Sequence, residues 1–401
     1  MDKGDKNKNK KKIALVLSGG GARGAYEVGV LKYLFENFPN ANFDIYCGTS
    51  VGAIHTVAIS SMKGIENDAI RMLESIWKNM NMNEVLEFGP LKARDIFLWV
   101  LGKGKEFRRS LFNTSVIRKY VQSKIQWQRL HQLTQSEEIS SVAIAATHIG
   151  SGIVTIFIES KNKNIEWRDP FCRPENTLLS FKHILASASV HFIFPSVKIN
   201  TEYYCDGGLR INTPLSPAIR LGTDKIFVIP LRMRYTSEER EKIFQDKKIN
   251  NYPSPFLLFG KIMNALAVDR IIYDIDRVEI MNRFISQSEI VCGQNFLERL
   301  NKEMRKIRGY EYRKIETLCI YPSRDIGMLA LLYASEITKK KKYPKIYSLL
   351  IKTMLPFGIE GQSDLLSYLL FDSEFTSELI NLGYNDAKEK KEEISKFFDF
   401  K

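Results

Sequence analysis

Residues 43–52 read Phe-Asp-Ile-Tyr-Cys-Gly-Thr-Ser-Val-Gly, and this stretch indicates the fold of the chain. Residues 43–47 form an apolar run of strand length, and after a tight glycine turn residues 51–62 have the spacing of a helix. Upstream, residues 13–17 are another strand-length run, followed by glycines and a helical pattern from Ala22. Because strands that alternate with helices are typical of a parallel sheet covered by helices, the sequence predicts an α/β fold.

The rest of the chain keeps this mixture of strands and helices. Helical patterns cover residues 65–135, residues 240–310 and the chain from residue 327 onward. Glycines at 150 and 152 favour a hairpin between the first two of the later strands. The later strands are predicted at 141–147, 153–158, 197–199, 203–205, 225–230 and 317–321.

These patterns predict three parts without an obvious linker between them. Residues 1–12 form a basic, disordered tail, residues 13–235 an α/β domain with helical insertions, and residues 236–401 a mostly helical portion packed on that domain. The last of the predicted strands, near residues 317–321, would join the sheet from this C-terminal portion.

The composition excludes several classes of protein. At 44% hydrophobic and 11% aromatic, the 401 residues have too many core-forming side chains for an intrinsically disordered chain. Five separated cysteines exclude a disulfide scaffold, and without a Cys-x-x-Cys pair they predict no zinc site. The chain has no apolar run of 18 residues and no signal peptide pattern at its N-terminus. We therefore expect a cytoplasmic or peripheral membrane protein, with signal-independent export left open.

The net charge of +13 is concentrated in three segments and suggests an anionic partner. Residues 1–12, 101–130 and 339–352 carry +4, +7 and +6, so that the remainder is slightly acidic. Around residues 96–109, cations mingle with Phe, Trp and Leu, which suits an element on an anionic membrane surface or a helical insertion packed on the core. We expect no nucleic acid partner, because no known binding module is recognisable.

Gly48-Thr-Ser50-Val-Gly52 lies between a predicted strand and a predicted helix, where a nucleophilic serine would stand on a sharp turn. Flanking glycines leave room for that turn, and the following helix points its positive end at the serine. The alternative is a glycine-rich turn in which Ser50 caps the helix.

Gly19, Gly20, Gly21, Ala22, Arg23 and Gly24 also follow a strand and begin a helix. The run matches the dinucleotide-binding pattern, but Asp44 stands at the start of the second strand, where it cannot reach a ribose. Consecutive glycine N–H groups at a helix N-terminus favour an oxyanion hole instead, and Arg23 could steady either the loop or the developing charge. The glycines could also serve only for close packing.

A nucleophilic serine needs a base, and the five histidines are poor candidates. His55 lies about one and a half helical turns beyond Ser50 and projects away from it. Asp206, followed by Gly207 and Gly208, is the better candidate, because a dry carboxylate can take a serine proton directly. An ordinary turn is the alternative for these three residues.

Taken together, the three motifs resemble the patatin-like phospholipase family in type and order. Ala186-Ser-Ala-Ser189 and Phe194-Pro195, ahead of the aspartate motif, strengthen the resemblance, which covers residues 12–232 well and extends more weakly to the C-terminus. Ser189, Val190-His191 and His148 depart from the family pattern at positions that could reshape the substrate pocket.

The resemblance implies a three-layer α/β/α fold with a mainly parallel sheet and an enzyme with a Ser50–Asp206 dyad. Residues 19–24 would form and support the oxyanion hole, and the reaction would need neither a metal nor another cofactor. The substrate would be a phospholipid, lysophospholipid or other acyl lipid, hydrolysed through an acyl-enzyme. The alternative is a catalytically silent lipid-binding protein on the same scaffold. A dyad also predicts that activity falls only on acidification, without a histidine-like step near neutrality.

Overall fold

The computed structural model describes residues 11–85, 115–190, 194–246, 270–340, 342–343, 351 and 360–400. The basic and apolar segment at 96–109, most of the tail at 1–12 and His191 lie outside these residues. No helix within the described ranges is both long and apolar enough to cross a membrane.

A nine-stranded sheet forms the centre of the protein, with the main order β5-β4-β3-β2-β1-β8-β9, and β7 pairs with β3 while β6 pairs with β7. β1, β2, β3, β8 and β9 are parallel to one another, whereas β4 and β7 are antiparallel to β3. The strands are β1 Ile13–Leu17, β2 Ile45–Thr49, β3 Ser141–His148, β4 Val154–Glu159, β5 Cys172–Asn176, β6 Val197–Ile199, β7 Glu202–Asp206, β8 Lys225–Ile229 and β9 Glu316–Cys319.

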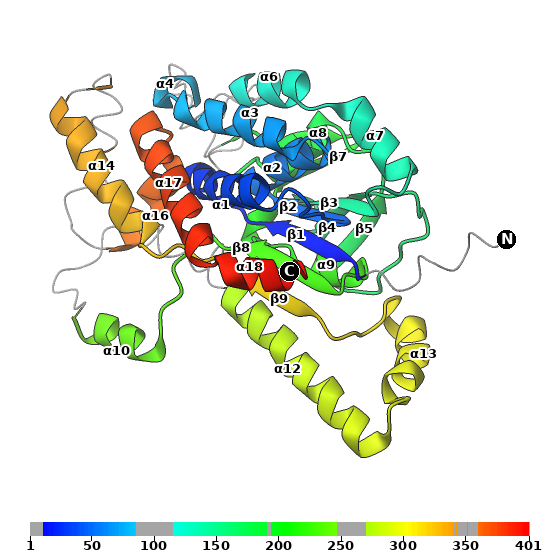
Figure 1. Ribbon diagram of the computed structural model, residues 1–401. Helices are drawn as coiled ribbons and strands as arrows, with labels where there is room; N and C mark the ends of the chain where they lie inside the picture. Colours follow the sequence, from blue (N-terminus) through cyan, green and yellow to red (C-terminus); the bar gives the residue numbers. More distant parts are fainter. Residues whose placement is uncertain are drawn as a thin grey trace.

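Helices cover both faces of this sheet, so that the molecule has the three layers that were predicted (Figure 1). The described helices are α1 Ala25–Asn37, α2 Val51–Ser60, α3 Glu66–Lys78, α4 Met82–Val85, α6 Ser115–Lys124, α7 Trp127–Gln135, α8 Phe181–Ser187, α9 Leu215–Arg220, α10 Ser237–Asp246, α12 Arg270–Cys292, α13 Phe296–Arg308, α14 Ile326–Lys340, α16 Glu360–Leu369, α17 Ser373–Glu389 and α18 Lys391–Phe397. α1 and α2 cover one face of the sheet, and α9 and α12 the other.

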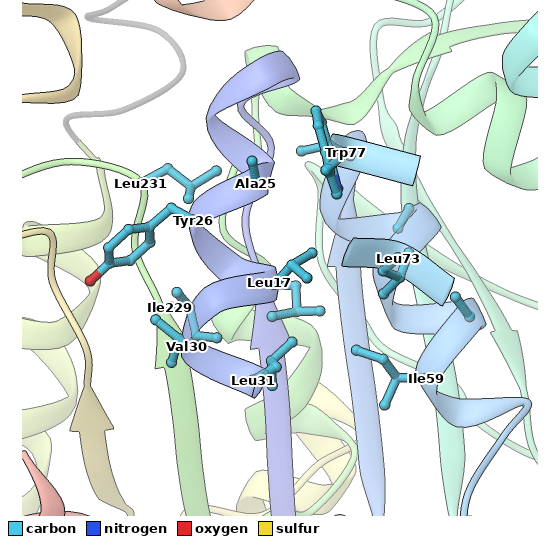
Figure 2. Close-up of a cluster of buried hydrophobic side chains, with 14 of the residues drawn as sticks. Leu17, Ala25, Tyr26, Val30, Leu31, Ile59, Leu73, Trp77, Ile229 and Leu231 are labelled. Carbon is cyan, nitrogen blue, oxygen red and sulfur yellow. The ribbon is translucent and has the colours of Figure 1, made fainter. Parts of the chain in front are cut away.

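Alternate residues of β1 belong to the two hydrophobic cores. Leu15 and Leu17 point into the core under α1 and α2, whereas Ala14 and Val16 point into the core above α9 and α12. Figure 2 shows the first of these cores, where Leu17 lies beside the α1 side chains. A strand buried on both faces reads as an uninterrupted apolar run, which is why residues 13–17 are recognisable in the sequence.

The strands agree with the predicted positions to within two residues, with one exception. β5, which reads Cys-Arg-Pro-Glu-Asn, was not predicted, because its composition is poor for a strand. It lies at the edge of the sheet beside β4, where a proline is tolerated. α1 also begins later than expected, because Gly21–Gly24 form a 3₁₀ turn before it.

The C-terminal helices pack directly on the predicted α/β domain. α17 packs against α1 (Figure 1), and the two helices meet so closely that a Cβ atom on Gly383 would lie 2.2 Å from the carbonyl oxygen of Tyr26. The Tyr26 hydroxyl also donates to Asp386 at 2.9 Å. Residues near the two ends of the chain therefore share one core.

Replacing Gly383 by alanine should force α1 and α17 apart. Because the added methyl group would collide with backbone, we expect the free energy of unfolding to fall by about 1–3 kcal/mol, measured by chemical denaturation. Asn381→Ala, an exposed position on the same helix, is the matched control and should change stability by less than about 0.5 kcal/mol. Equal stability of the two variants would contradict the close contact.

Candidate active site

Ser50 stands on the turn between β2 and α2 and is 6% exposed. Its backbone has φ 56° and ψ −123°, which is unusual for a residue with a side chain. A Cβ atom on Gly48 would lie 2.4 Å from the carbonyl oxygen of Gly52, and one on Gly52 would lie 2.6 Å from that of Leu17. The sharp turn therefore requires glycine on both sides of Ser50.

The glycine loop after β1 lies against this turn, because β1 and β2 are parallel neighbours and their carboxyl ends meet. A Cβ atom on Gly19 would lie 3.2 Å from the Cβ atom of Ser50. Asn212 binds both backbone groups of Gly19. The Gly19 N–H donates to the Asn212 carbonyl at 2.9 Å, and the Asn212 side-chain amide donates to the Gly19 carbonyl at 3.0 Å. Among the described residues, no acceptor engages the N–H groups of Gly20 and Gly21.

Arg23 leaves this loop toward the C-terminal helix α16 and is 2% exposed. Its Nε donates to the Ser367 hydroxyl at 2.7 Å, and its guanidinium lies 4.5 Å from the centre of the Tyr368 ring. A second hydrogen bond joins its Nη1 to the carbonyl of Leu231 at 3.3 Å. Of the two roles considered for Arg23, these contacts favour steadying the loop.

Asp206 ends β7 and is brought to Ser50 by the antiparallel pairing of β7 with β3, which places it opposite Ala146. Its Oδ1 accepts a hydrogen bond from the Gly208 N–H at 2.6 Å. Oδ2 is buried and has no partner of ordinary hydrogen-bond geometry in the described part of the chain, although the Ser50 hydroxyl is close enough to lower the pKa of the carboxyl group. The carboxylate is thus dry and has one oxygen available.

Burial raises the pKa of Asp206 from 3.8 to about 6, and the nearby Ser50 hydroxyl and the hydrogen bond from Gly208 limit the rise. Desolvation disfavours the charged form of a carboxyl group, so a proton is held more tightly here than in water. Such a group is a stronger base than an exposed aspartate and is still ionised at neutral pH.

The described histidines bind other groups. His55 is buried in α2, where its Nε2 accepts from the Trp77 indole at 3.1 Å. Because an indole N–H can only donate, the proton of a neutral His55 is on Nδ1, which lies 2.8 Å from a Glu27 oxygen. His131, His148 and His183 contact Glu159, Glu202 and Ser180, respectively.

Two residues near Ser50 and Asp206 are not among the site residues predicted from the sequence. Asn212 begins the sequence Asn-Thr-Pro214, four residues after Gly208, and Ser187 belongs to the Ala-Ser-Ala-Ser stretch. The stretch was noted only for its family resemblance, and nothing local to it indicates a contact with Ser50. Among the described residues, no group of three or more His, Cys, Asp or Glu side chains is placed to hold a metal ion.

Residues 15–219 match the family model described as patatin-like phospholipase. The match spans more than half of the 401 residues and includes all three motifs, so this chain belongs to the patatin-like phospholipase family. Membership implies lipid acyl hydrolase activity in general and lipids as substrates.

Two other comparisons add no further assignment. No curated protein matches the chain significantly. The crystal structure of VipD from Legionella pneumophila is similar at 11% sequence identity, over 94% of this chain and 91% of that chain, with a TM-score of 0.30. We base the family assignment on the sequence match alone.

Proposed function

We propose that this protein hydrolyses fatty-acyl esters of membrane phospholipids or lysophospholipids, with Ser50 as the nucleophile and Asp206 as the general base. The observation that carries the proposal is the buried Asp206 carboxylate, which has an available oxygen beside the hydroxyl of a strained serine. Backbone strain at a serine that begins a helix is typical of an activated nucleophile.

In the first half of the proposed reaction, the Ser50 oxygen attacks the ester carbonyl while its proton passes to Asp206. The N–H groups of Gly20 and Gly21 donate to the developing oxyanion, and the N-terminus of α2 adds a favourable field. When the tetrahedral intermediate collapses, the ester C–O bond breaks and Asp206 returns its proton to the departing alcohol. The acyl group is then bonded to Ser50.

In the second half, Asp206 takes a proton from water as that water attacks the acyl carbonyl. Collapse of this second intermediate breaks the bond to Ser50, which recovers the proton from Asp206, and the fatty acid leaves. One carboxyl group thus serves as base and acid in turn. Every proton and leaving group is accounted for by residues of this chain and one water molecule.

A panel of defined lipids tests the proposal. Wild-type protein should release fatty acid from at least one phospholipid or lysophospholipid and should be labelled by a fluorophosphonate probe, whereas Ser50→Ala should do neither. Comparing sn-1, sn-2 and lysophospholipid esters identifies the bond that is cut, because the shape of the pocket decides it. Binding of liposomes without release of fatty acid from any lipid would favour a silent lipid-binding protein instead.

The pH dependence should follow the ionisation of Asp206. We expect kcat/KM for a soluble short-chain ester to fall below a midpoint of about pH 6 and to be level above it, because only the ionised carboxylate accepts the Ser50 proton. The midpoint that we expect is in the range typical of a histidine, because burial raises the pKa of Asp206. A profile that stays level down to pH 4.5 would contradict Asp206 as the base.

A further inference from the structure

Residues 187–189, the last residue of α8 and the two that follow it, contact the backbone of the nucleophile. The Ser187 hydroxyl accepts a hydrogen bond from the Ser50 N–H at 2.9 Å and donates one to the Ala145 carbonyl at 2.6 Å. Ser187 is fully buried, so water cannot replace either partner. The strained turn at Ser50 is thereby fastened to the middle of β3.

The same segment also contacts the backbone of the proposed base. The Asp206 N–H donates to the Ser189 carbonyl at 2.9 Å. On its other side, the Asp206 carbonyl accepts from the Thr147 hydroxyl of β3 at 3.0 Å. Ser50 and Asp206, which are far apart in the sequence, are thus both hydrogen-bonded to residues 187–189. Asp206 also binds β3 directly, whereas Ser50 is joined to β3 through Ser187.

We propose that residues 187–189 set the separation between Ser50 and Asp206, and that Ser187 is a positioning residue for the nucleophile. This inference rests on the proposed function, since it assumes that Ser50 and Asp206 react together. The Ala-Ser-Ala-Ser stretch then contributes to catalysis by holding the backbone of the nucleophile in place, and it need not contact the substrate.

The energetic reason lies in the conformation of Ser50. With φ 56° the residue is held in a strained turn, which persists only while its surroundings fix it. Without the Ser187 hydroxyl, the Ser50 N–H is buried without a hydrogen-bond partner. A shift of the turn that brings this N–H to another acceptor then lowers the free energy of the folded protein. A shift of a few tenths of an ångström or more moves the Ser50 oxygen relative to Asp206.

Ser187→Ala tests the inference. We expect kcat for a soluble ester to fall about 10- to 100-fold with KM nearly unchanged, because a misplaced reacting atom impairs the transition state more than binding. Labelling by a fluorophosphonate should slow in proportion. Ser61→Ala is the matched control: this hydroxyl is also fully buried, but it donates to the Ala58 carbonyl at 2.9 Å, at the far end of α2.

The pH profile separates positioning from a general loss of stability. The Ser50 hydroxyl lowers the pKa of Asp206, so a displaced Ser50 should move the acid midpoint of Ser187→Ala to higher pH. Loss of thermal stability alone would leave that midpoint where it is, as in Ser61→Ala. If Ser187→Ala does not fold, Ser187→Cys fills similar space with a weaker acceptor and carries the same measurements.

An active wild type together with wild-type kcat and midpoint in the Ser187 variant would overturn the inference and leave the proposed function standing. If wild-type protein releases no fatty acid and is not labelled, the proposed function itself fails. The two failures are therefore distinguishable in one experiment.

Discussion

Ser50→Ala should reduce kcat for a fatty-acyl ester by roughly 10⁴- to 10⁶-fold, the range found when the nucleophile of a covalent hydrolase is removed. The loss is this large because the acyl-enzyme can no longer form, and water must attack the ester without the two-step route. Measurement of fatty acid release at substrate saturation gives the value directly. Residual activity above one per cent of the wild type would exclude Ser50 as the nucleophile.

A second substitution separates the chemistry from the fold. Ser50→Gly lacks the nucleophile too, but glycine adopts the conformation at this turn with less strain than alanine. We expect the two variants to be equally inactive, with Ser50→Gly more stable than Ser50→Ala by about 1 kcal/mol. A glycine variant that is less stable than the alanine variant would show that the turn is not strained.

Asp206→Asn should reduce kcat about 10³- to 10⁴-fold, which is the second largest effect expected. Asparagine has nearly the same shape and can still accept from the Gly208 N–H, so the loss would report the missing base and not a collapsed loop. Fatty acid release at pH 8, where the wild-type carboxylate is ionised, is the measurement. Retention of more than a tenth of the activity would point to another base.

The same variant should be more stable than the wild type at pH 7. Because burial raises the pKa of Asp206 in the folded state, its contribution to stability is fully present below about pH 4 and is lost as the pH rises through about 6. A shift from 3.8 to about 6 corresponds to about 3 kcal/mol at neutral pH, which asparagine avoids because it never ionises. Denaturation at pH 4.5 and pH 7 tests this: the advantage of Asp206→Asn should grow with pH, and a constant difference would contradict it.

The parts of the fold that could be predicted are those whose conformation depends on residues close together in the sequence. β1 and β2 are apolar because they are buried on both faces, and the turn at Ser50 needs glycines at 48 and 52 for local steric reasons. β5 could not be predicted in this way, because an edge strand needs no such composition.

In the candidate site too, some features could be predicted from local sequence and others could not. Local patterns suggested Ser50 and Asp206 separately, and the resemblance to a family paired them, but no local pattern connects Ser187 to Ser50 or Ser367 to Arg23. Those hydrogen bonds join segments far apart in the chain, and a serine that makes one reads like any other serine. The raised pKa of Asp206 could not be foreseen either, since it depends on burial by the assembled fold.

The contact between Arg23 and α16 has a consequence for how the protein is made. Synthesis runs from the N-terminus, so the glycine loop leaves the ribosome long before Ser367 and Tyr368, which hold its arginine. Until those residues and α17 have been added, α1 also lacks the helix that packs along it. A growing chain therefore contains Ser50 and Asp206 before it contains the residues that hold Arg23 and the glycine loop in place. The candidate site of this lipid hydrolase can be completed only when translation has nearly ended.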